Sequence, residues 1–293
     1  MTFERAVFQT GAPPFPVPKT RSRRSQAGRS APPRRERMVI TMPVLETKDL
    51  GITFGGLRAV DDVYIKVEEK EIVGLIGPNG AGKTTVFNLL TGVYTPSKGA
   101  IRFQGKSIIG KKPYQINRIG IARTFQNIRL FKNMTVLDNI KVAMQQHMKY
   151  NVASAVLRLP AYWREERETT SKAHELLEIF DMDDSADQLA SNLPYGRQRK
   201  LEILRALAAQ PRLLLLDEPA AGMNPTETFE LMETIRRIRD MFGVAILLIE
   251  HDMSLVMGVC ERIYVLDYGT LIADGTPEEI RSNEKVIKAY LGG

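Results

Sequence analysis

Apolar and polar residues alternate along two stretches in the first quarter of the chain, and this alternation predicts half-exposed β-strands. The first stretch covers residues 45–54 and the second covers residues 62–67. Residues 72–76 form a continuous apolar run followed by Gly77 and Pro78, which is typical of a strand in the interior of a sheet. We therefore expect two strands at a sheet surface and one buried strand.

Helical periodicity follows the buried strand. Residues 84–92 carry apolar side chains at helical spacing and end at Gly92, and a strand pair follows around residues 100–103. Residues 127–192 differ from the rest of the chain, because they are charged, repeat their apolar residues at helical intervals and lack a strong strand signal. They indicate a helical insertion between strands of the sheet.

The last third of the chain returns to strands. Apolar runs at 213–216 and 245–249 predict buried strands, with a helix at about 226–242 between them. A hairpin is expected over residues 263–272. The whole pattern is typical of an α/β fold with buried parallel strands and an antiparallel edge.

Composition excludes several classes of protein. The 293 residues are 43% hydrophobic and 26% charged, which excludes collagen-like and wholly disordered chains. No apolar run approaches the roughly 18–20 residues that span a bilayer. The single cysteine, Cys260, excludes an internal disulfide framework and a multi-cysteine zinc site, and it favours a reducing compartment.

All of the net charge lies in the first 37 residues. They hold nine basic and two acidic residues, which accounts for the +7 of the whole chain. Their proline, arginine and serine content predicts a disordered extension over residues 1–42 and an ordered domain over residues 43–293. A basic arm for anionic lipid or nucleic acid, or a transit peptide, is the alternative. Since the rest of the chain is neutral, no nucleic-acid partner is expected for the domain.

A phosphate-binding pattern, G-x-x-x-x-G-K-[ST], lies between the buried strand and the first helix. Its glycines let backbone amides turn toward phosphate oxygens, and the helix N-terminus adds partial positive charge. Lys83 is expected to reach the β- and γ-phosphates, and the Thr84 hydroxyl to bind Mg²⁺. The predicted nucleoside triphosphate site consists of Gly77, Pro78, Asn79, Gly80, Ala81, Gly82, Lys83, Thr84 and Thr85.

Two carboxylates follow the apolar strand at 213–216. Carboxylates at the carboxyl ends of inner strands lie in the crevice where such sheets bind ligands. Asp217 is therefore a candidate ligand of Mg²⁺, and Glu218 a candidate to polarise an attacking water. The competing interpretation is a carboxylate that caps the next helix.

Residues 44–293, with both motifs in order, resemble the ATP-binding cassette (ABC) ATPase family. The resemblance implies an α/β P-loop NTPase (RecA-like) core with an antiparallel β subdomain and a helical subdomain inserted at about 127–195. It implies ATP and Mg²⁺ as cofactors. It also assigns three further residues: Gln126 as a sensor and ligand of Mg²⁺ and of the attacking water, His251 as a γ-phosphate contact, and Phe54 as a ring that stacks on adenine.

Residues 193–198 occupy the position of the family's signature segment, before a helix expected at 200–209. In the family, this helix N-terminus grips the γ-phosphate held by a second cassette, so the resemblance implies a dimer with Tyr195 and Gly196 at the partner's nucleotide. Pro194 stands where a serine is usual and Tyr195 where a glycine is usual, so the contact is expected to rest on the Gly196 amide and the helix dipole. Asn224 falls in the loop through which paired cassettes communicate.

Four strings resemble the ATPase subunits of branched-chain amino acid importers: ARTFQNIRLFKNMTVLDN, LPYGRQRKLEI, EPAAGMNP and TPEEIRSNEKVIKAYLGG. This implies ATP hydrolysis at the cytoplasmic face of the inner membrane, coupled to permease subunits and indirectly to a periplasmic substrate-binding protein. The permease is expected to dock at residues 126–139, with Arg129, Leu130 and Phe131 as candidate contacts.

Three alternatives to an importer subunit are an ATPase of lipopolysaccharide export, a soluble non-transport cassette protein that acts on nucleic acid or the ribosome, and a monomeric P-loop kinase or GTPase. Soluble cassette proteins usually carry two cassettes or a long coiled coil, and this sequence has neither. The kinase or GTPase interpretation leaves the signature segment and His251 unexplained.

Overall fold

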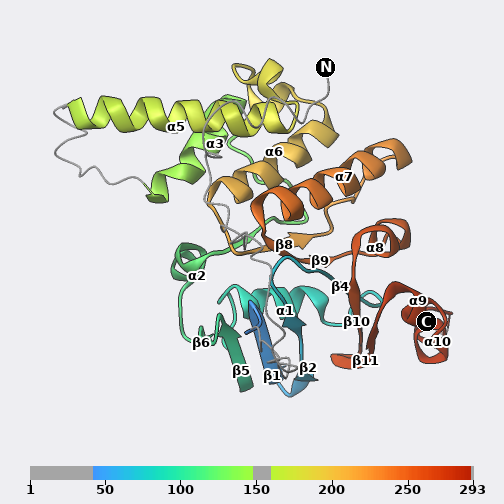
Figure 1. Ribbon diagram of the computed structural model, residues 1–293. Coiled ribbons are helices and arrows are strands. Elements are labelled where there is room, and N and C mark those ends of the chain that lie inside the picture. The colour runs from blue at the N-terminus through green and yellow to red at the C-terminus, as the bar shows by residue number, and fades with distance from the viewer. Residues whose placement is uncertain (1–41, 148–159, 292–293) are drawn as a thin grey trace, which may run out of the picture.

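The computed structural model of the protein describes residues 42–147 and 160–291. Three tiers are visible in Figure 1, with an antiparallel sheet below, a larger sheet in the middle and a group of helices above. The predicted extension over residues 1–42 lies outside the described residues, except for Met42.

The antiparallel sheet has the strand order β2-β1-β5-β6, with β3 also paired to β1. Its strands are β1 (Leu45–Phe54), β2 (Leu57–Val63), β3 (Lys66–Val67), β5 (Lys98–Phe103) and β6 (Lys106–Ser107). The strand predicted over residues 62–67 was wrong in its bounds, because β2 starts earlier and ends at Val63, and β3 covers only Lys66–Val67. Asp62, with φ +53°, lies in β2 where its pairing with β1 is irregular. The predicted face was right: Val63, Ile65 and Val67 are all fully buried.

The larger sheet has the order β11-β10-β4-β9-β8-β7. All neighbouring pairs are parallel except β10 with β11 (Thr270–Gly275), which forms the expected antiparallel edge. The other strands are β4 (Ile72–Ile76), β7 (Ile121–Arg123), β8 (Leu213–Asp217), β9 (Ala245–Ile249) and β10 (Arg262–Asp267). Strands β4, β8 and β9 are buried at every position, as expected for apolar runs inside a parallel sheet. The predicted α/β class is confirmed.

Helix α1 (Lys83–Leu90) lies between the two sheets in Figure 1. Its buried side chains share one hydrophobic core with the antiparallel strands and with one face of the parallel sheet. This core fixes the amino end of α1 at the carboxyl end of β4, with the glycine-rich loop between them.

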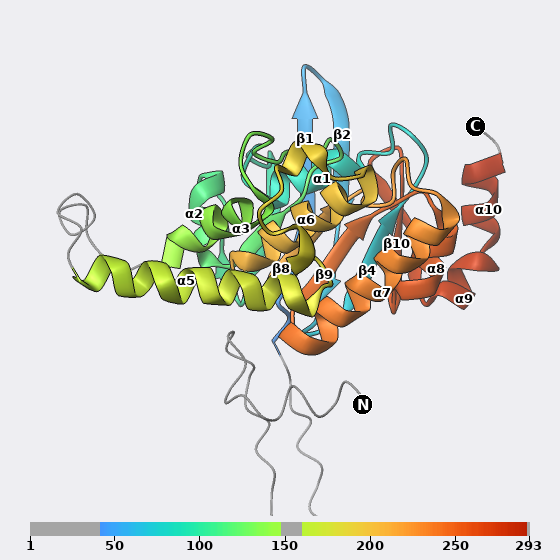
Figure 2. The same cartoon turned by 90° about the horizontal axis from the view of Figure 1, so that it is seen from above.

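A second core covers the other face of the parallel sheet. The helices that contribute to it are α3 (Val136–Met144), α5 (Pro160–Ile179), α6 (Tyr195–Ala208), α7 (Pro225–Phe242), α8 (Met253–Val259), α9 (Pro277–Arg281) and α10 (Glu284–Leu291). Helix α2 (Pro113–Ile119) instead contributes Ile116 to the first core. Figure 2 shows the far end of α5 extending beyond the body of the molecule. None of the helices in the described part of the chain is both long and apolar enough to cross a bilayer.

The helix expected at residues 200–209 begins five residues earlier, at Tyr195. Pro194 is the N-cap of α6. A proline is tolerated there because an N–H at the start of a helix has no acceptor within the helix, and the fixed φ of proline is compatible with a helix start. The signature residues Tyr195 and Gly196 therefore lie within the first turn of α6 and not before it.

Candidate active site

The loop between β4 and α1 has a conformation that only glycine allows at two positions. Gly77 has φ +150°, and a side-chain carbon there would lie 2.0 Å from the carbonyl oxygen of Leu266. Gly82 has φ +103°, and a side-chain carbon there would lie 2.7 Å from the carbonyl oxygen of Ala59. The loop is therefore packed from behind by neighbouring backbone, while Asn79 and Gly80 at its tip are exposed.

Lys83 lies against this loop. Its ammonium donates to the carbonyls of Gly77 at 2.6 Å and Pro78 at 2.9 Å, and burial lowers its pKa while Glu218 and Asp217 act in the opposite direction. Thr84, the next residue of α1, is exposed, and Thr85 is half-buried. The helix N-terminus therefore carries a buried cation, Lys83, next to an exposed threonine, Thr84. This combination is suited to bind the phosphates of a nucleotide.

Asp217, at the end of β8, forms a buried ion pair with Arg123 of β7. One carboxylate oxygen lies 2.6 Å from the guanidinium, and the side chains of Arg123 and Asp217 are 8% and 5% exposed. Arg123 also donates to Asn88 and Thr91 at the end of α1. The sequence analysis missed Arg123. An arginine in a short buried strand needs an acidic partner, so its position could have indicated a buried ion pair.

Glu218 has an unusual backbone conformation. Its φ is +47°, in the left-handed region that costs a non-glycine residue free energy, and such strain gathers at functional sites. Its amide donates to the carbonyl of Ile249 at 2.9 Å, which holds the strained residue beside β9. The side chain is 14% exposed.

Two of the predicted catalytic side chains meet at the carboxylate of the third, Glu218. The Gln126 amide nitrogen donates to one oxygen at 2.6 Å, and His251 Nδ1 lies 3.5 Å from the other. The three residues follow strands β7, β8 and β9, which are adjacent and parallel, so their carboxyl ends open at the same edge of the sheet. The arrangement is suited to hold a carboxylate in place as a general base.

Glu250 is a residue of this region that the sequence reasoning missed. It is 1% exposed, and it accepts hydrogen bonds from the amides of Ala220, His251 and Asp252. Burial raises its pKa, and these amides oppose the rise. The Glu250 carboxylate therefore joins the segment after Glu218 to the segment that carries His251.

Three of the remaining predicted site residues, Tyr195, Gly196 and Asn224, lie at the starts of α6 and α7. Tyr195 donates from its hydroxyl to the carbonyl of Ala221 at 2.9 Å, and a side-chain carbon at Gly196 would lie 2.9 Å from Glu227. Asn224 caps α7, since its side chain accepts the Glu227 amide at 3.0 Å. The α6 start and the α7 start thus lie side by side, and any role for these residues toward a second nucleotide stays a prediction.

Phe54 lies at the end of β1. Its ring is 43% exposed and meets the edge of Tyr94 at a centroid distance of 5.2 Å. Tyr94 follows the carboxyl end of α1, whereas the phosphate-binding loop precedes the amino end. Stacking of Phe54 on adenine therefore stays a prediction.

The oxygen donors near the loop fit Mg²⁺ better than a transition metal. No group of three or more His, Cys, Asp or Glu side chains among the described residues is arranged to hold a metal ion. Mg²⁺ does not need one, because it is usually bound through one or two carboxylates and substrate phosphates and keeps several waters. The exposed hydroxyl of Thr84 and the free oxygen of Asp217 match that donor set.

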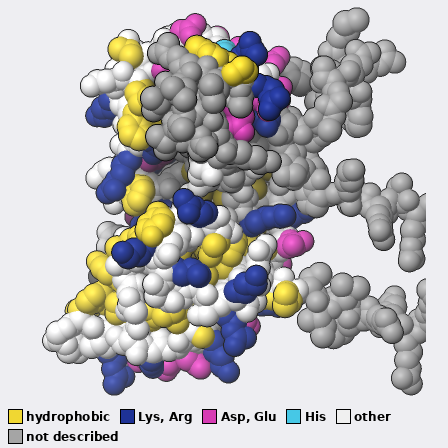
Figure 3. Space-filling view, turned by 90° about the vertical axis from the view of Figure 1, so that its left-hand side faces the viewer, with side chains coloured by type: hydrophobic (Ala, Val, Ile, Leu, Met, Phe, Trp, Pro, Cys, Tyr) yellow, Lys and Arg dark blue, Asp and Glu magenta, His cyan; other side chains and the backbone are white. Residues whose placement is uncertain are grey.

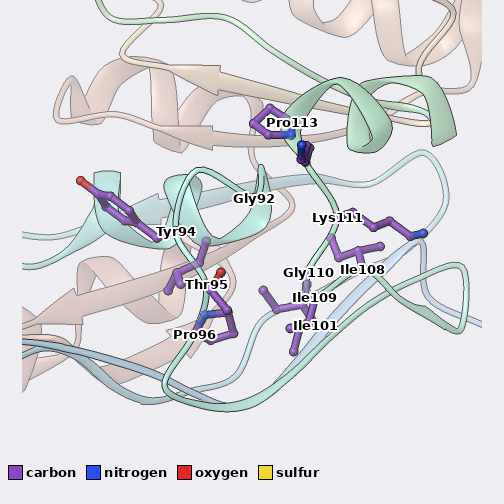
Figure 4. A pocket seen from close by; sticks show the side chains of 12 residues that line it. Gly92, Tyr94, Thr95, Pro96, Ile101, Ile108, Ile109, Gly110, Lys111 and Pro113 are labelled. Atoms are coloured by element: carbon purple, nitrogen blue, oxygen red, sulfur yellow. The ribbon is translucent and has the colours of Figure 1, made fainter.

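Figure 4 shows a cavity at the opposite end of α1. It has a volume of about 180 Å³ and is lined in part by Gly92, Tyr94 and Pro96, which follow α1, and by residues 108–113. Ligand pockets usually measure about 300–1,000 Å³. The loop at the amino end of α1, and not this cavity, is therefore the candidate nucleotide site.

Comparisons with known proteins agree with this site. Residues 60–221 match the family model described as ABC transporter, and residues 270–293 match the one described as branched-chain amino acid ATP-binding cassette transporter. The high-affinity branched-chain amino acid transport ATP-binding protein BraF of Pseudomonas aeruginosa is 50% identical over 253 residues, which cover 86% of this chain and 99% of BraF. The lipopolysaccharide export system ATP-binding protein LptB of Escherichia coli is 37% identical over 251 residues, which cover 86% of this chain and 98% of LptB.

A solved structure shares the fold. The crystal structure of a nucleotide-free ATP-binding cassette from an ABC transporter has a TM-score of 0.74 at 32% identity, and the match covers 86% of this chain and 100% of that one. The expected P-loop NTPase fold is thereby confirmed. The family match covers more than half of the chain, and the phosphate-binding loop lies near Glu218 and its partners Gln126 and His251. The chain therefore belongs to the ABC transporter family as an ATP-binding, ATP-hydrolysing cassette.

Proposed function

We propose that this ATPase powers a membrane importer for branched-chain amino acids. The observation that carries the ATPase part is the meeting of Gln126, Glu218 and His251 beside the loop of Lys83. The substrate rests on the resemblance to BraF over nearly its full length and on the family match at residues 270–293.

In the proposed reaction, the loop amides and Lys83 bind the phosphates and the α1 N-terminus adds positive charge. Glu218 orients a water molecule toward the γ-phosphate and takes its proton. Gln126 holds one oxygen of Glu218, so the other oxygen faces the water and His251. Mg²⁺, when bound by Thr84, Gln126 and Asp217, would neutralise charge on the phosphates.

A second cassette completes the site in this proposal. The α6 N-terminus presents the Gly196 amide and the Tyr195 ring, which is 44% exposed, toward the nucleotide of the partner. ATP that bridges two chains stabilises the closed dimer through charge-assisted hydrogen bonds on both sides. Hydrolysis removes the bridging phosphate, and the closed dimer then loses the hydrogen bonds that stabilise it relative to the open state.

The permease is proposed to dock beside residues 126–139, on the cytoplasmic side of the membrane. Phe131 is 47% exposed there, and its ring lies 5.4 Å from the Arg205 guanidinium. On the side of the molecule that faces left in Figure 1, hydrophobic side chains are interspersed with Lys and Arg side chains (Figure 3). Such a surface is suited to an amphipathic helix of a membrane partner.

Phe131→Ala should weaken binding to the permease. An aromatic anchor at the centre of an interface contributes on the order of 2 kcal/mol or more, so affinity should fall at least about 30-fold. Co-purification of the cassette with its membrane subunits measures the effect. Phe229→Ala, an exposed aromatic of α7, is the matched control and should leave co-purification intact. Equal losses in both variants would contradict this docking site.

The choice between import and lipopolysaccharide export is settled by the membrane subunits that accompany the chain. Purification of the complex from membranes, followed by identification of these subunits and by leucine uptake in reconstituted vesicles, tests the proposal. ATP-dependent leucine uptake is the expected result. Association with lipopolysaccharide export components, or recovery without any integral subunit, would overturn it.

A further inference from the structure

Helix α6 contains a fully buried ion pair. The Arg199 guanidinium lies 2.9 Å from a Glu202 carboxylate oxygen, and the two side chains are 0% and 2% exposed. Burial of two charges is costly, and well-packed apolar residues often serve stability as well or better. A role in the folded protein other than stability is therefore expected of this pair.

The shortest of the pair's other hydrogen bonds go to one short segment. Arg199 donates to the carbonyls of Phe125 and Gln126, each at 2.7 Å, and Glu202 accepts the amide of Arg129 at 3.0 Å. We call residues 125–129 the Gln126 segment. Both of its ends are thus held by side chains from a single turn of α6.

The Phe125 side chain of the Gln126 segment also contacts two arginines. The centroid of the Phe125 ring lies 4.0 Å from the guanidinium carbon of Arg129 and 5.1 Å from that of Arg123. Arg123 is itself paired with Asp217. The segment is therefore linked to α6 through Arg199 and Glu202 and, through the contact of Phe125 with Arg123, to Asp217 at the end of β8.

The position of this segment decides whether Gln126 reaches Glu218. The Gln126 backbone carbonyl is bound by Arg199, while its side chain donates to Glu218 at 2.6 Å. Arg199 also lies 3.5 Å from the Glu218 carbonyl and from the Tyr195 hydroxyl. One buried guanidinium thus contacts the start of α6, the Gln126 segment and the backbone of Glu218.

We propose that Arg199 and Glu202 are positioning residues that hold the backbone of the Gln126 segment where the Gln126 side chain reaches Glu218. The inference rests on the proposed roles of Gln126 and Glu218. Both residues extend from one turn of α6 and bind the two ends of the segment, and the Gln126 carbonyl that Arg199 binds belongs to the residue whose side chain donates to Glu218.

The test replaces the pair by apolar residues of similar size, Arg199→Met with Glu202→Leu, in the full-length protein. Removing both charges leaves neither one buried alone, so the chain should still fold. Amide hydrogen exchange at Arg129, which loses its acceptor, should speed up at least about tenfold. The kcat for ATP should fall about 100-fold, while ATP affinity stays within about twofold because Lys83 and its loop are untouched.

Two further variants serve as a conservative substitution and as a control for the removal of an ion pair. Arg199→Lys retains the charge but offers a single ammonium, which cannot bind two carbonyls in a fixed fork, and its kcat should lie between the wild type and the double variant. Arg262→Met with Glu71→Leu removes a partly buried ion pair, with side chains 27% and 13% exposed, that does not touch the Gln126 segment, and it should leave both exchange at Arg129 and kcat unchanged.

The proposal is overturned by wild-type exchange at Arg129, by an unchanged kcat, or by a loss of ATP affinity that parallels the loss of kcat. The last result would indicate a merely structural pair. Absence of ATPase activity in the wild type itself would instead contradict the proposed hydrolysis at Glu218, so the two failures are distinct.

Discussion

Glu218→Gln should lower ATP hydrolysis by about 1,000-fold and leave ATP bound. General-base catalysis contributes roughly 10²- to 10⁴-fold, and the amide of glutamine has no basic oxygen to take the proton of water. The size and shape of the side chain hardly change, and Lys83, the proposed phosphate ligand, is not altered. The variant should therefore bind ATP as the wild type does and accumulate in the nucleotide-bound dimer.

Three measurements check this prediction: steady-state phosphate release, retention of radiolabelled ATP after gel filtration, and the mass of the ATP-bound species by light scattering. Glu233→Gln, on the exposed part of α7, is the control and should hydrolyse ATP at the wild-type rate. Turnover of the Glu218→Gln variant within tenfold of wild type would remove Glu218 from the role of base. Loss of ATP binding would show that it serves the nucleotide site in another way.

Arg123→Met should destabilise the fold by about 3–5 kcal/mol, because it leaves Asp217 buried without its partner. The Asp217 side chain is 5% exposed and its carboxylate is paired with Arg123 at 2.6 Å. The variant also loses the hydrogen bonds from Arg123 to Asn88 and Thr91. The midpoint of urea unfolding measures the loss.

The double variant Arg123→Met with Asp217→Leu tests whether the unpaired charge of Asp217 causes the loss of stability. If the orphaned charge accounts for the loss, removal of that charge should restore most of the stability, although ATP hydrolysis would be lost with Asp217. The comparison for an exposed pair is Arg239→Met at the Arg239–Glu261 contact, where the expected loss is at most about 1 kcal/mol. Equal losses at Arg123 and Arg239 would contradict the argument from burial.

Several features could be predicted from local sequence because their cause is local. Apolar runs such as residues 72–76 and 213–216 have no polar face to expose, so they become interior strands wherever the chain places them. The loop before Lys83 is specified by its glycines, whose φ values no other residue adopts without strain. The predicted start of α6 was wrong because Pro194 was interpreted as a departure from the family pattern and not as a residue that can precede a helix.

The sequence by itself determined the α/β fold, the phosphate-binding loop and the positions of Asp217 and Glu218 at a strand end, since these follow from residue type, periodicity and spacing. Only the tertiary structure decided which side chains surround them. Arg123, Arg199 and Glu250 reach partners on other strands and loops, up to 94 residues away in the case of Arg123 and Asp217. The pairing follows from the order of the parallel strands and from the need of each buried charge for a partner, and no local pattern encodes either.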